Sequence, residues 1–441
     1  MSDRRTTGQL GSTRGTRRRR SASRSRRRGR NQKNPLLFLI PLLLLLAVGA
    51  WLLLRGNDKK ETPDRAEAAP VETVNIVSSV STPVEETGQI FQAENTDEAE
   101  LAKRYYYSLL DENQQMIYRE IVQGIQEHQE TIVTKGGDPE LAVEVYGWVY
   151  MDYPEFFWIT GASQATGYGE PQNYCEITPE YGISAEEAAN RQVQVDAAAA
   201  EYLNGIQDSM GDYDKIKYIF ETCIRKIDYV KDAPDNQNLY SGLVNCQTVC
   251  AGYSRTFQYL MNQLGIPVIY VTGTTDTGEA HGWNMVKCGE NYYNVDVTWG
   301  DPIFAEGESG EYNLPADLIY YDFLCTSDAE FSNTHQSDVK AVLPACNATD
   351  LEYYRLIGRY MDTFDPEQIL WKMEEDIAQT KESSEFKFAT DELMGQAMEA
   401  RQGLLDQAST YLCDYYSLES VKYTYSEDTT MRKLMVFWQY S

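Results

Sequence analysis

Apolar residues recur every three or four positions through much of the chain between residues 98 and 227, a spacing that predicts amphipathic helices. Two short helices are expected between residues 98 and 125, a third over residues 141–151, and two longer ones over residues 185–207 and 213–227. The aromatic run Phe156-Phe157-Trp158 follows the turn signal Asp152-Tyr153-Pro154 and is expected to be a strand in the core. Residues 98–210 are therefore predicted to form a helical N-terminal region.

The pattern changes after residue 248 to one helix followed by strands. Five apolar side chains share one face of a helix predicted over residues 250–264, namely Tyr253, Phe257, Leu260, Met261 and Leu264. A β-branched strand is expected over residues 268–272, a turn-rich stretch over 273–278, and two further strands over 281–288 and 291–299. Gly289-Glu290 separates the last two strands and suits a two-residue hairpin turn. These elements are predicted to form a core over residues 211–334.

Beyond this core, short strands and one long helix predict a small α/β unit over residues 335–441. The strands are expected at residues 386–388, 421–425 and 434–438, and the helix at residues 391–412. Together with the helix and antiparallel strands of the core, these elements place the chain in the α+β class. A chain of 441 residues exceeds what one hydrophobic core usually organises, so two or three packed units are expected.

An uncharged, leucine-rich stretch from Pro35 to Leu54 is long enough to cross a bilayer core of about 30 Å as a helix. We predict a transmembrane helix over residues 35–55, a basic cytoplasmic tail over 1–34 and a flexible spacer over 56–97. Because lysine and arginine stay on the cytoplasmic side, the later domains are expected outside the cell membrane. A cleaved signal peptide is the alternative, although Trp51-Leu52-Leu53-Leu54 continues the apolar run past Ala50.

Charge is divided unevenly along the chain. The formal net charge of −28 combines 13 lysines and arginines with one acid in residues 1–33, and 26 bases against 66 acids in the remainder. Such an acidic body repels nucleic acid, so no nucleic-acid partner is expected for it. The arginine-rich tail by itself suits nucleic-acid binding, and that alternative predicts salt-dependent binding by residues 1–33 alone.

Eight cysteines are too few for a disulfide-framed scaffold in so long a chain. Their spacings match no strong zinc signature, and the chain has only three histidines, so neither a metal nor another cofactor is expected. Cys246 stands four residues before Cys250 and is either a neighbouring thiol or a disulfide partner that would silence Cys250 reversibly.

Cys250 lies in the first turn of the helix predicted over residues 250–264, and Thr248 is expected to be its N-cap. Unsatisfied backbone amides and the positive end of the helix dipole favour a thiolate at this position. The sequence therefore predicts a cysteine prepared as a nucleophile.

The predicted hairpin brings a histidine and an aspartate close to each other. A two-residue turn places Cys288 opposite Asn291, so His281 faces Thr298 and Asp296 becomes a diagonal neighbour of His281 on the same face. Four apolar residues are expected on the other face, namely Tyr293, Val295, Val297 and Trp299. An imidazole can take the thiol proton and return it to a leaving amine, while a carboxylate fixes the imidazole tautomer.

The order of these residues resembles the transglutaminase-like superfamily, which has a papain-like core. Four segments carry the resemblance: Cys250-Ala251-Gly252-Tyr253, Leu264-Gly265-Ile266-Pro267, His281-Gly282-Trp283-Asn284 and Val295-Asp296-Val297-Thr298-Trp299. It covers roughly residues 213–334, little more than a quarter of the chain. The resemblance implies a catalytic triad of Cys250, His281 and Asp296 and a protein or peptide substrate, with cell-wall peptide among those considered.

Chemically, the resemblance implies that Cys250 attacks a glutamine side chain or a peptide bond and forms a thioester. The acyl group is then transferred to an amine or to water. The second oxyanion donor of the family lies upstream of the cysteine, where Gln247 and Tyr240 are the candidates. Four residues are candidates to line the cleft, with core packing as the alternative: Tyr253, Trp283, Asn284 and Trp299. A catalytically silent adhesion or scaffold module at the cell surface is the alternative function.

Overall fold

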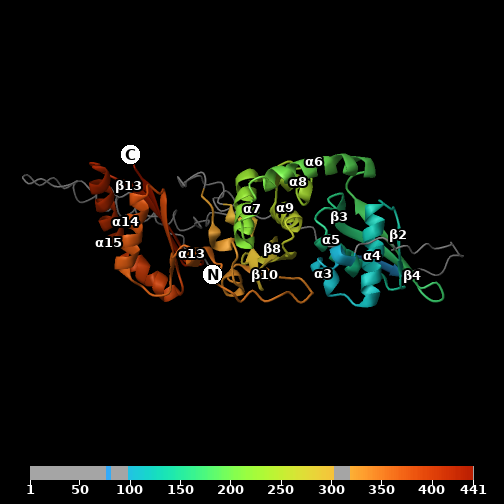
Figure 1. The fold of residues 1–441 in the computed structure, drawn as a ribbon. Helices are drawn as coiled ribbons and strands as arrows, with labels where there is room; N and C mark the ends of the chain where they lie inside the picture. The colour runs from blue at the N-terminus through green and yellow to red at the C-terminus, as the bar shows by residue number, and fades with distance from the viewer. Residues whose placement is uncertain (1–75, 81–97, 302–317, 441) are drawn as a thin grey trace, which may run out of the picture.

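The computed structural model describes residues 76–80, 98–301 and 318–440, which form an elongated row of three packed units (Figure 1). Within these ranges no helix combines the length and the apolar character needed to cross a membrane. The predicted basic tail and transmembrane helix lie outside the described residues. Part of the predicted spacer is a strand instead, because β1 (Ile76–Val80) pairs in parallel with a strand of the N-terminal unit.

The N-terminal unit is a helical layer on a four-stranded sheet, so it contains more strand than the helical region predicted, and the strand expected at residues 156–158 begins only at Ile159. Its helices are α2 (Glu98–Leu101), α3 (Tyr105–Ser108), α4 (Glu112–Gln126) and α5 (Pro139–Asp152). Its strands follow the order β1-β3-β4-β2, with β2 at Ile132–Lys135, β3 at Ile159–Tyr168 and β4 at Tyr174–Tyr181. The buried face of β3 includes Gly161, Ser163, Ala165 and Gly167, which give no alternating apolar signal.

The central unit packs helix α9 (Cys250–Gln263) on an antiparallel sheet, as the sequence predicted. The sheet order is β10-β7-β8-β9, and the strands are β7 (Val268–Thr275), β8 (Ala280–Cys288), β9 (Asn291–Val295) and β10 (His335–Ser337). Three further helices pack beside α9: α6 (Ala185–Leu203), α7 (Asp212–Lys226) and α8 (Leu239–Leu243). The short pair β5 (Asp228–Tyr229) and β6 (Gln247–Thr248) leads into α9.

The hairpin of β8 and β9 has the predicted register, since Cys288 pairs with Asn291 and Asn284 with Val295. The strand predicted to run to Trp299 nevertheless ends at Val295. Asp296 caps the short helix α10 (Val297–Gly300) with its carboxylate, and this local bond turns the chain out of the sheet. Strand β7 in turn extends to Thr275, through part of the stretch predicted to be a turn, because β10 pairs with it there.

The C-terminal unit is α/β, as predicted, and its sheet has the order β11-β12-β14-β13. The strands are β11 (Tyr360–Met361), β12 (Ser383–Phe388), β13 (Lys422–Asp428) and β14 (Lys433–Gln439). The helices are α13 (Tyr353–Leu356), α14 (Pro366–Ala378) and α15 (Asp391–Tyr416). Met435 and Phe437 of β14 contact Leu318 of the central unit, so this sheet also packs against the neighbouring core.

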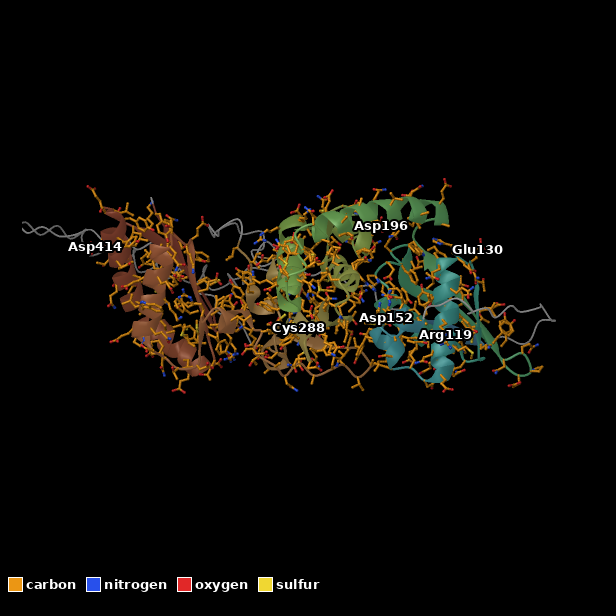
Figure 2. All side chains as sticks on the ribbon, in the orientation of Figure 1. Arg119, Glu130, Asp152, Asp196, Cys288 and Asp414 are labelled. Carbon is orange, nitrogen blue, oxygen red and sulfur yellow. The ribbon has the colours of Figure 1, made fainter. Side chains whose placement is uncertain are left out.

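Buried polar contacts join the three units. Arg255 of α9 donates to the carbonyl oxygens of Tyr150 and Met151, at the end of α5. The next residue, Asp152, lies on the side of the N-terminal unit that faces the central unit (Figure 2). Within the N-terminal unit, its carboxylate accepts from the backbone amide of Tyr106 in α3. On the other side of the core, the short helix η3 (Tyr321–Phe323) contributes a buried aspartate that binds lysines of the C-terminal unit.

Candidate active site

Cys250 is the first residue of α9 and is fully buried. Val249 is the N-cap, so the prediction that Thr248 caps the helix is wrong. The Thr248 hydroxyl donates instead to the carbonyl oxygen of Asn236 at 2.6 Å and lies 2.7 Å from the Ser241 hydroxyl. Because the first-turn amides of a helix have no intrahelical acceptor, the helix start still favours a thiolate at Cys250.

His281 and Asp296 form a direct hydrogen bond, with 2.7 Å between His281 Nε2 and Asp296 Oδ2. Both side chains are fully buried. The other ring nitrogen of His281, Nδ1, has no nitrogen or oxygen partner among the described residues. Cys250 is close enough to this imidazole to raise the pKa of His281, so His281 stands between the thiol and the carboxylate.

The Asp296 carboxylate is held by backbone amides as well as by imidazoles. Its Oδ1 atom accepts from the amide of Thr298 at 2.9 Å and from the amide of Trp299 at 3.1 Å. The amide of Asp296 donates to the carbonyl oxygen of Phe323 at 3.0 Å. These bonds fix the position of the Asp296 carboxylate, and the carboxylate in turn orients the His281 ring.

The charges of the three groups support one another. Burial disfavours a charged imidazole, but Asp296 and Cys250 outweigh this effect and raise the pKa of His281 to about 10. Burial likewise disfavours the Asp296 carboxylate, and His281 and His335 nevertheless hold its pKa well below the ordinary value. An ionised Asp296 can only accept hydrogen bonds, so His281 donates from Nε2 and leaves Nδ1 to exchange a proton with the thiol.

His335 also contacts Asp296, and sequence reasoning missed it. Its Nε2 atom lies 3.0 Å from Asp296 Oδ2, the same oxygen that binds His281. His335 stands on β10, a three-residue strand at the edge of the sheet, where no periodic pattern marks it. The sequence offered one signal for His335. The chain has only three histidines, and this one directly follows the segment, residues 213–334, that resembles the transglutaminase-like superfamily.

One imidazole nitrogen from each of His281 and His335 and one oxygen of Asp296 lie within 4.8 Å of one another, a grouping that could also be the ligand set of a metal ion. On one tetrahedral zinc ion, with bonds of about 2.0 Å, nitrogen and oxygen ligands would be about 3.3 Å apart. The observed separations of 2.7 and 3.0 Å are those of hydrogen bonds. These three side chains are therefore held together by hydrogen bonds and do not have the spacing of ligands around one tetrahedral ion.

Neither candidate for the second oxyanion donor bonds to Cys250. The Tyr240 hydroxyl donates to Gln194 Oε1 on α6 at 2.9 Å, and the Tyr240 ring lies under Arg191. Gln247 is exposed on β6, three residues before Cys250. The backbone amide of Cys250, at the start of α9, is the oxyanion donor that the fold itself supplies.

The four residues considered for the cleft are all buried. The Tyr253 hydroxyl lies within hydrogen-bonding distance of Ile227 O and of Asp301 Oδ2, at 2.7 and 2.9 Å, and Asn284 Nδ2 donates to Ile269 O at 3.4 Å. The rings of Trp283 and Trp299 lie 6.4 and 5.8 Å from the His281 ring, so both belong to the surroundings of the imidazole. Trp299 was predicted on the opposite face, but α10 turns it toward His281.

Cys246 lies beside Cys223, and both interact with Tyr202. The Tyr202 hydroxyl is 3.8 Å from Cys246 Sγ, and Cys246 contributes to raising the pKa of the buried Cys223 thiol. Cys246 and Cys250 are both free thiols. The structure thus shows Cys246 as a neighbouring thiol and shows no bond between it and Cys250.

A cysteine at a helix start, with a histidine and an aspartate from the adjoining sheet, defines a site of the cysteine acyl-transfer class. Residues 199–297 match the family described as the Transglutaminase-like superfamily, and this segment contains Cys250, His281 and Asp296. The central unit is therefore a transglutaminase-like domain, in a superfamily whose enzymes are generally cysteine-dependent acyltransferases and peptidases. His335 lies beyond the matched segment.

Three solved structures show weaker likeness, each with a TM-score of 0.23. A TGase is 12% identical over 35% of this chain and 53% of its own, and a protein from Cytophaga hutchinsonii proposed to be a cysteine protease is 16% identical over 30% and 53%. Menin, described with a binding site for the Mixed Lineage Leukemia protein, is 14% identical over 69% and 66%. The chain spans about half the length of the first two, and no curated protein matches it.

Proposed function

We propose that this protein is a cysteine-dependent enzyme that cleaves or transfers the acyl group of an amide in a protein or peptide. The observation that carries the proposal is the position of His281, which interacts with Cys250 and hydrogen-bonds Asp296 through Nε2 at 2.7 Å. A structural histidine needs only a satisfied ring. Here Nδ1 has no nitrogen or oxygen partner among the described residues, which is what a base facing a thiol requires.

The reaction follows from the roles of these atoms. His281 Nδ1 takes the thiol proton of Cys250, and the thiolate sulfur attacks the amide carbon to form a C–S bond. The amide of Cys250 donates to the resulting oxyanion. The C–N bond then breaks, His281 returns the proton to the leaving amine, and a thioester remains until water or a second amine attacks it.

Substrate entry requires a rearrangement, because Cys250, His281 and Asp296 are all fully covered in this conformation. Water is therefore excluded from the site before substrate arrives, which strengthens each electrostatic interaction within it. The helix predicted from sequence over residues 35–55 would anchor the enzyme in the membrane and place the catalytic unit outside, next to surface proteins and wall peptides.

Product analysis with a glutaminyl peptide, with and without a primary amine, tests this function. Release of ammonia with deamidation indicates transfer to water, and a cross-linked product indicates transfer to the amine. Cleavage within a peptide indicates peptidase activity. We expect Cys250→Ser to abolish the products and the matched control Cys246→Ser to retain them. Equal turnover by Cys250→Ser and the wild type would refute the role proposed for Cys250. Absence of every product from the folded wild-type protein would refute the enzymatic proposal and leave a catalytically silent module at the cell surface.

A further inference from the structure

Three residues form one hydrogen-bonded chain in the buried site, His281, Asp296 and His335, and Cys250 interacts with the His281 end of it. Asp296 Oδ2 accepts from His281 Nε2 at 2.7 Å and from His335 Nε2 at 3.0 Å. The side chains of both histidines and of the aspartate have no exposed surface. The Asp296 carboxylate therefore lies between the imidazoles of His281 and His335.

The reactive form of the three proposed catalytic groups carries an unbalanced charge. A thiolate, an imidazolium and a carboxylate together bear one net negative charge. Cys250, His281 and Asp296 are each 0% exposed, and burying a net charge costs several kcal/mol or more. A second imidazolium in contact with Asp296 would bring the buried cluster to neutrality.

The surroundings of His335 suit a positive charge. The ring stacks on Phe331 with centroids 4.0 Å apart, and the rings of Trp299 and Trp283 lie 4.5 and 5.3 Å away. Aromatic rings within about 6 Å attract a cation that faces them. On the ring's other side, Nδ1 is 2.8 Å from Thr334 Oγ1, and that hydroxyl is 3.3 Å from the Phe331 carbonyl oxygen. Thr334 can thus donate to Phe331 and accept from a protonated Nδ1.

We propose that His335 is a positively charged positioning residue, which holds the Asp296 carboxylate and neutralises the buried thiolate–imidazolium–carboxylate chain. Its ring faces the Asp296 carboxylate at the start of α10 and the His281 imidazole on β8. Asp276 follows Thr275, the partner of His335 on β7, and is exposed. The inference rests on the proposed function. It adds that the reactive state of Cys250 depends on a charge outside the matched segment.

The test is the pH dependence of Cys250 alkylation by iodoacetamide in the full-length protein, wild type against His335→Gln. Glutamine keeps an N–H donor in place of Nε2 but removes the charge. Without that charge the thiolate is less stable, so we expect the midpoint of the rising limb to move up by about one pH unit. Alkylation at a pH below the midpoint should slow about tenfold. His128→Gln changes the third histidine, in the N-terminal unit, and should leave the profile unchanged.

An unshifted midpoint in a folded His335→Gln protein would overturn the inference, since a merely structural histidine would alter stability and not the profile. A second measurement does not depend on how that variant folds. Nitrogen NMR of the wild-type protein labelled in its three histidines should show both ring nitrogens of His335 protonated, and one unprotonated nitrogen would contradict the proposal. If Cys250 is alkylated as fast in His281→Ala as in the wild type, the proposed function is refuted instead. That result comes from a separate variant, so the two failures can be distinguished.

Discussion

Gly252 shows how a single residue positions Cys250, the proposed nucleophile. A Cβ atom at this position would lie 1.8 Å from Thr248 Oγ1, and that hydroxyl is already bonded to Asn236. Gly252 follows Cys250 by two residues in the first turn of α9. The glycine therefore allows the β6 segment to pack on the helix that begins with Cys250.

Replacing Gly252 by alanine should destabilise the protein by about 1–3 kcal/mol, because the added methyl group must displace Thr248 or the helix start. Cys250 alkylation should slow in the same variant. Urea unfolding and the alkylation rate measure these two effects. Gly395→Ala is the matched control, since nothing lies within 4 Å of its added Cβ in α15 and alanine favours a helix. Equal behaviour of the two variants would contradict this role of Gly252.

At this scale the sequence predicted much of the site, because its signals are local. Cys250 is marked by a helix start, and His281 and Asp296 by the register of a two-residue hairpin. His335 could not be found in this way, since it stands 39 positions from Asp296 on a strand of three residues. Its position depends on the pairing of β10 with β7, which is a tertiary property.

At the scale of elements, α9 connects Cys250 to the N-terminal unit through Arg255. The guanidinium is 2% exposed, donates to the last carbonyl groups of α5, and lies between the rings of Tyr150 and Tyr270 at 4.2 and 4.3 Å. A cation at a helix C-terminus is stabilised by the helix dipole. The N-terminal unit thereby holds the helix that begins with Cys250.

Arg255→Met should lower the free energy of unfolding by about 2–3 kcal/mol, because it removes the charged donor to the Tyr150 carbonyl oxygen and the contacts with the two tyrosine rings, while the Met151 carbonyl oxygen keeps Gln258 as a donor. Chemical denaturation measures the loss. Arg225→Met makes the same change at an exposed position on α7 and should alter stability by less than about 0.5 kcal/mol. Similar losses of unfolding free energy in both variants would show that Arg255 stabilises the protein no more than an exposed arginine does.

The elements themselves were predicted well where an apolar face is long and poorly where it is absent. α5, α7, α9 and α15 each have a continuous apolar stripe, and each was expected close to its observed bounds. The strand β3 presents small residues to the core, and β1 is held by backbone pairing to β3, so neither shows a hydrophobic period. The helix α10 arises from one side-chain cap at Asp296, which overrode the strand pattern.

At the scale of the whole molecule, Asp322 links the central and C-terminal units. Its carboxylate is fully buried, accepts from Lys387 Nζ on β12 at 2.9 Å and also binds Lys433 on β14. Burial disfavours this carboxylate, but the two lysines lower its pKa to about 2. The pKa lies below the ordinary value of 3.8, so the carboxylate contributes stability above about pH 4 that is lost as the pH falls toward 2.

Asp322→Asn should destabilise the protein by about 3–5 kcal/mol at neutral pH, because it leaves two buried lysines without their shared anion. Thermal unfolding measures the loss, and limited proteolysis should release the C-terminal unit earlier. Asp414→Asn, at the exposed end of α15 (Figure 2), is the control and should leave both unchanged. Wild-type resistance to proteolysis in Asp322→Asn would show that the unit is held by apolar contacts instead.

The account as a whole depends on a base that activates the Cys250 sulfur, and the rate of Cys250 alkylation against pH tests this most directly. In the wild-type protein, once the site opens, Cys250 should react faster than the other thiols, because His281 holds the proton taken from its sulfur up to about pH 10. His281→Ala should slow the reaction at neutral pH by about 100-fold, while His128→Ala leaves it unchanged. An alkylation rate that His281→Ala does not alter would contradict the account.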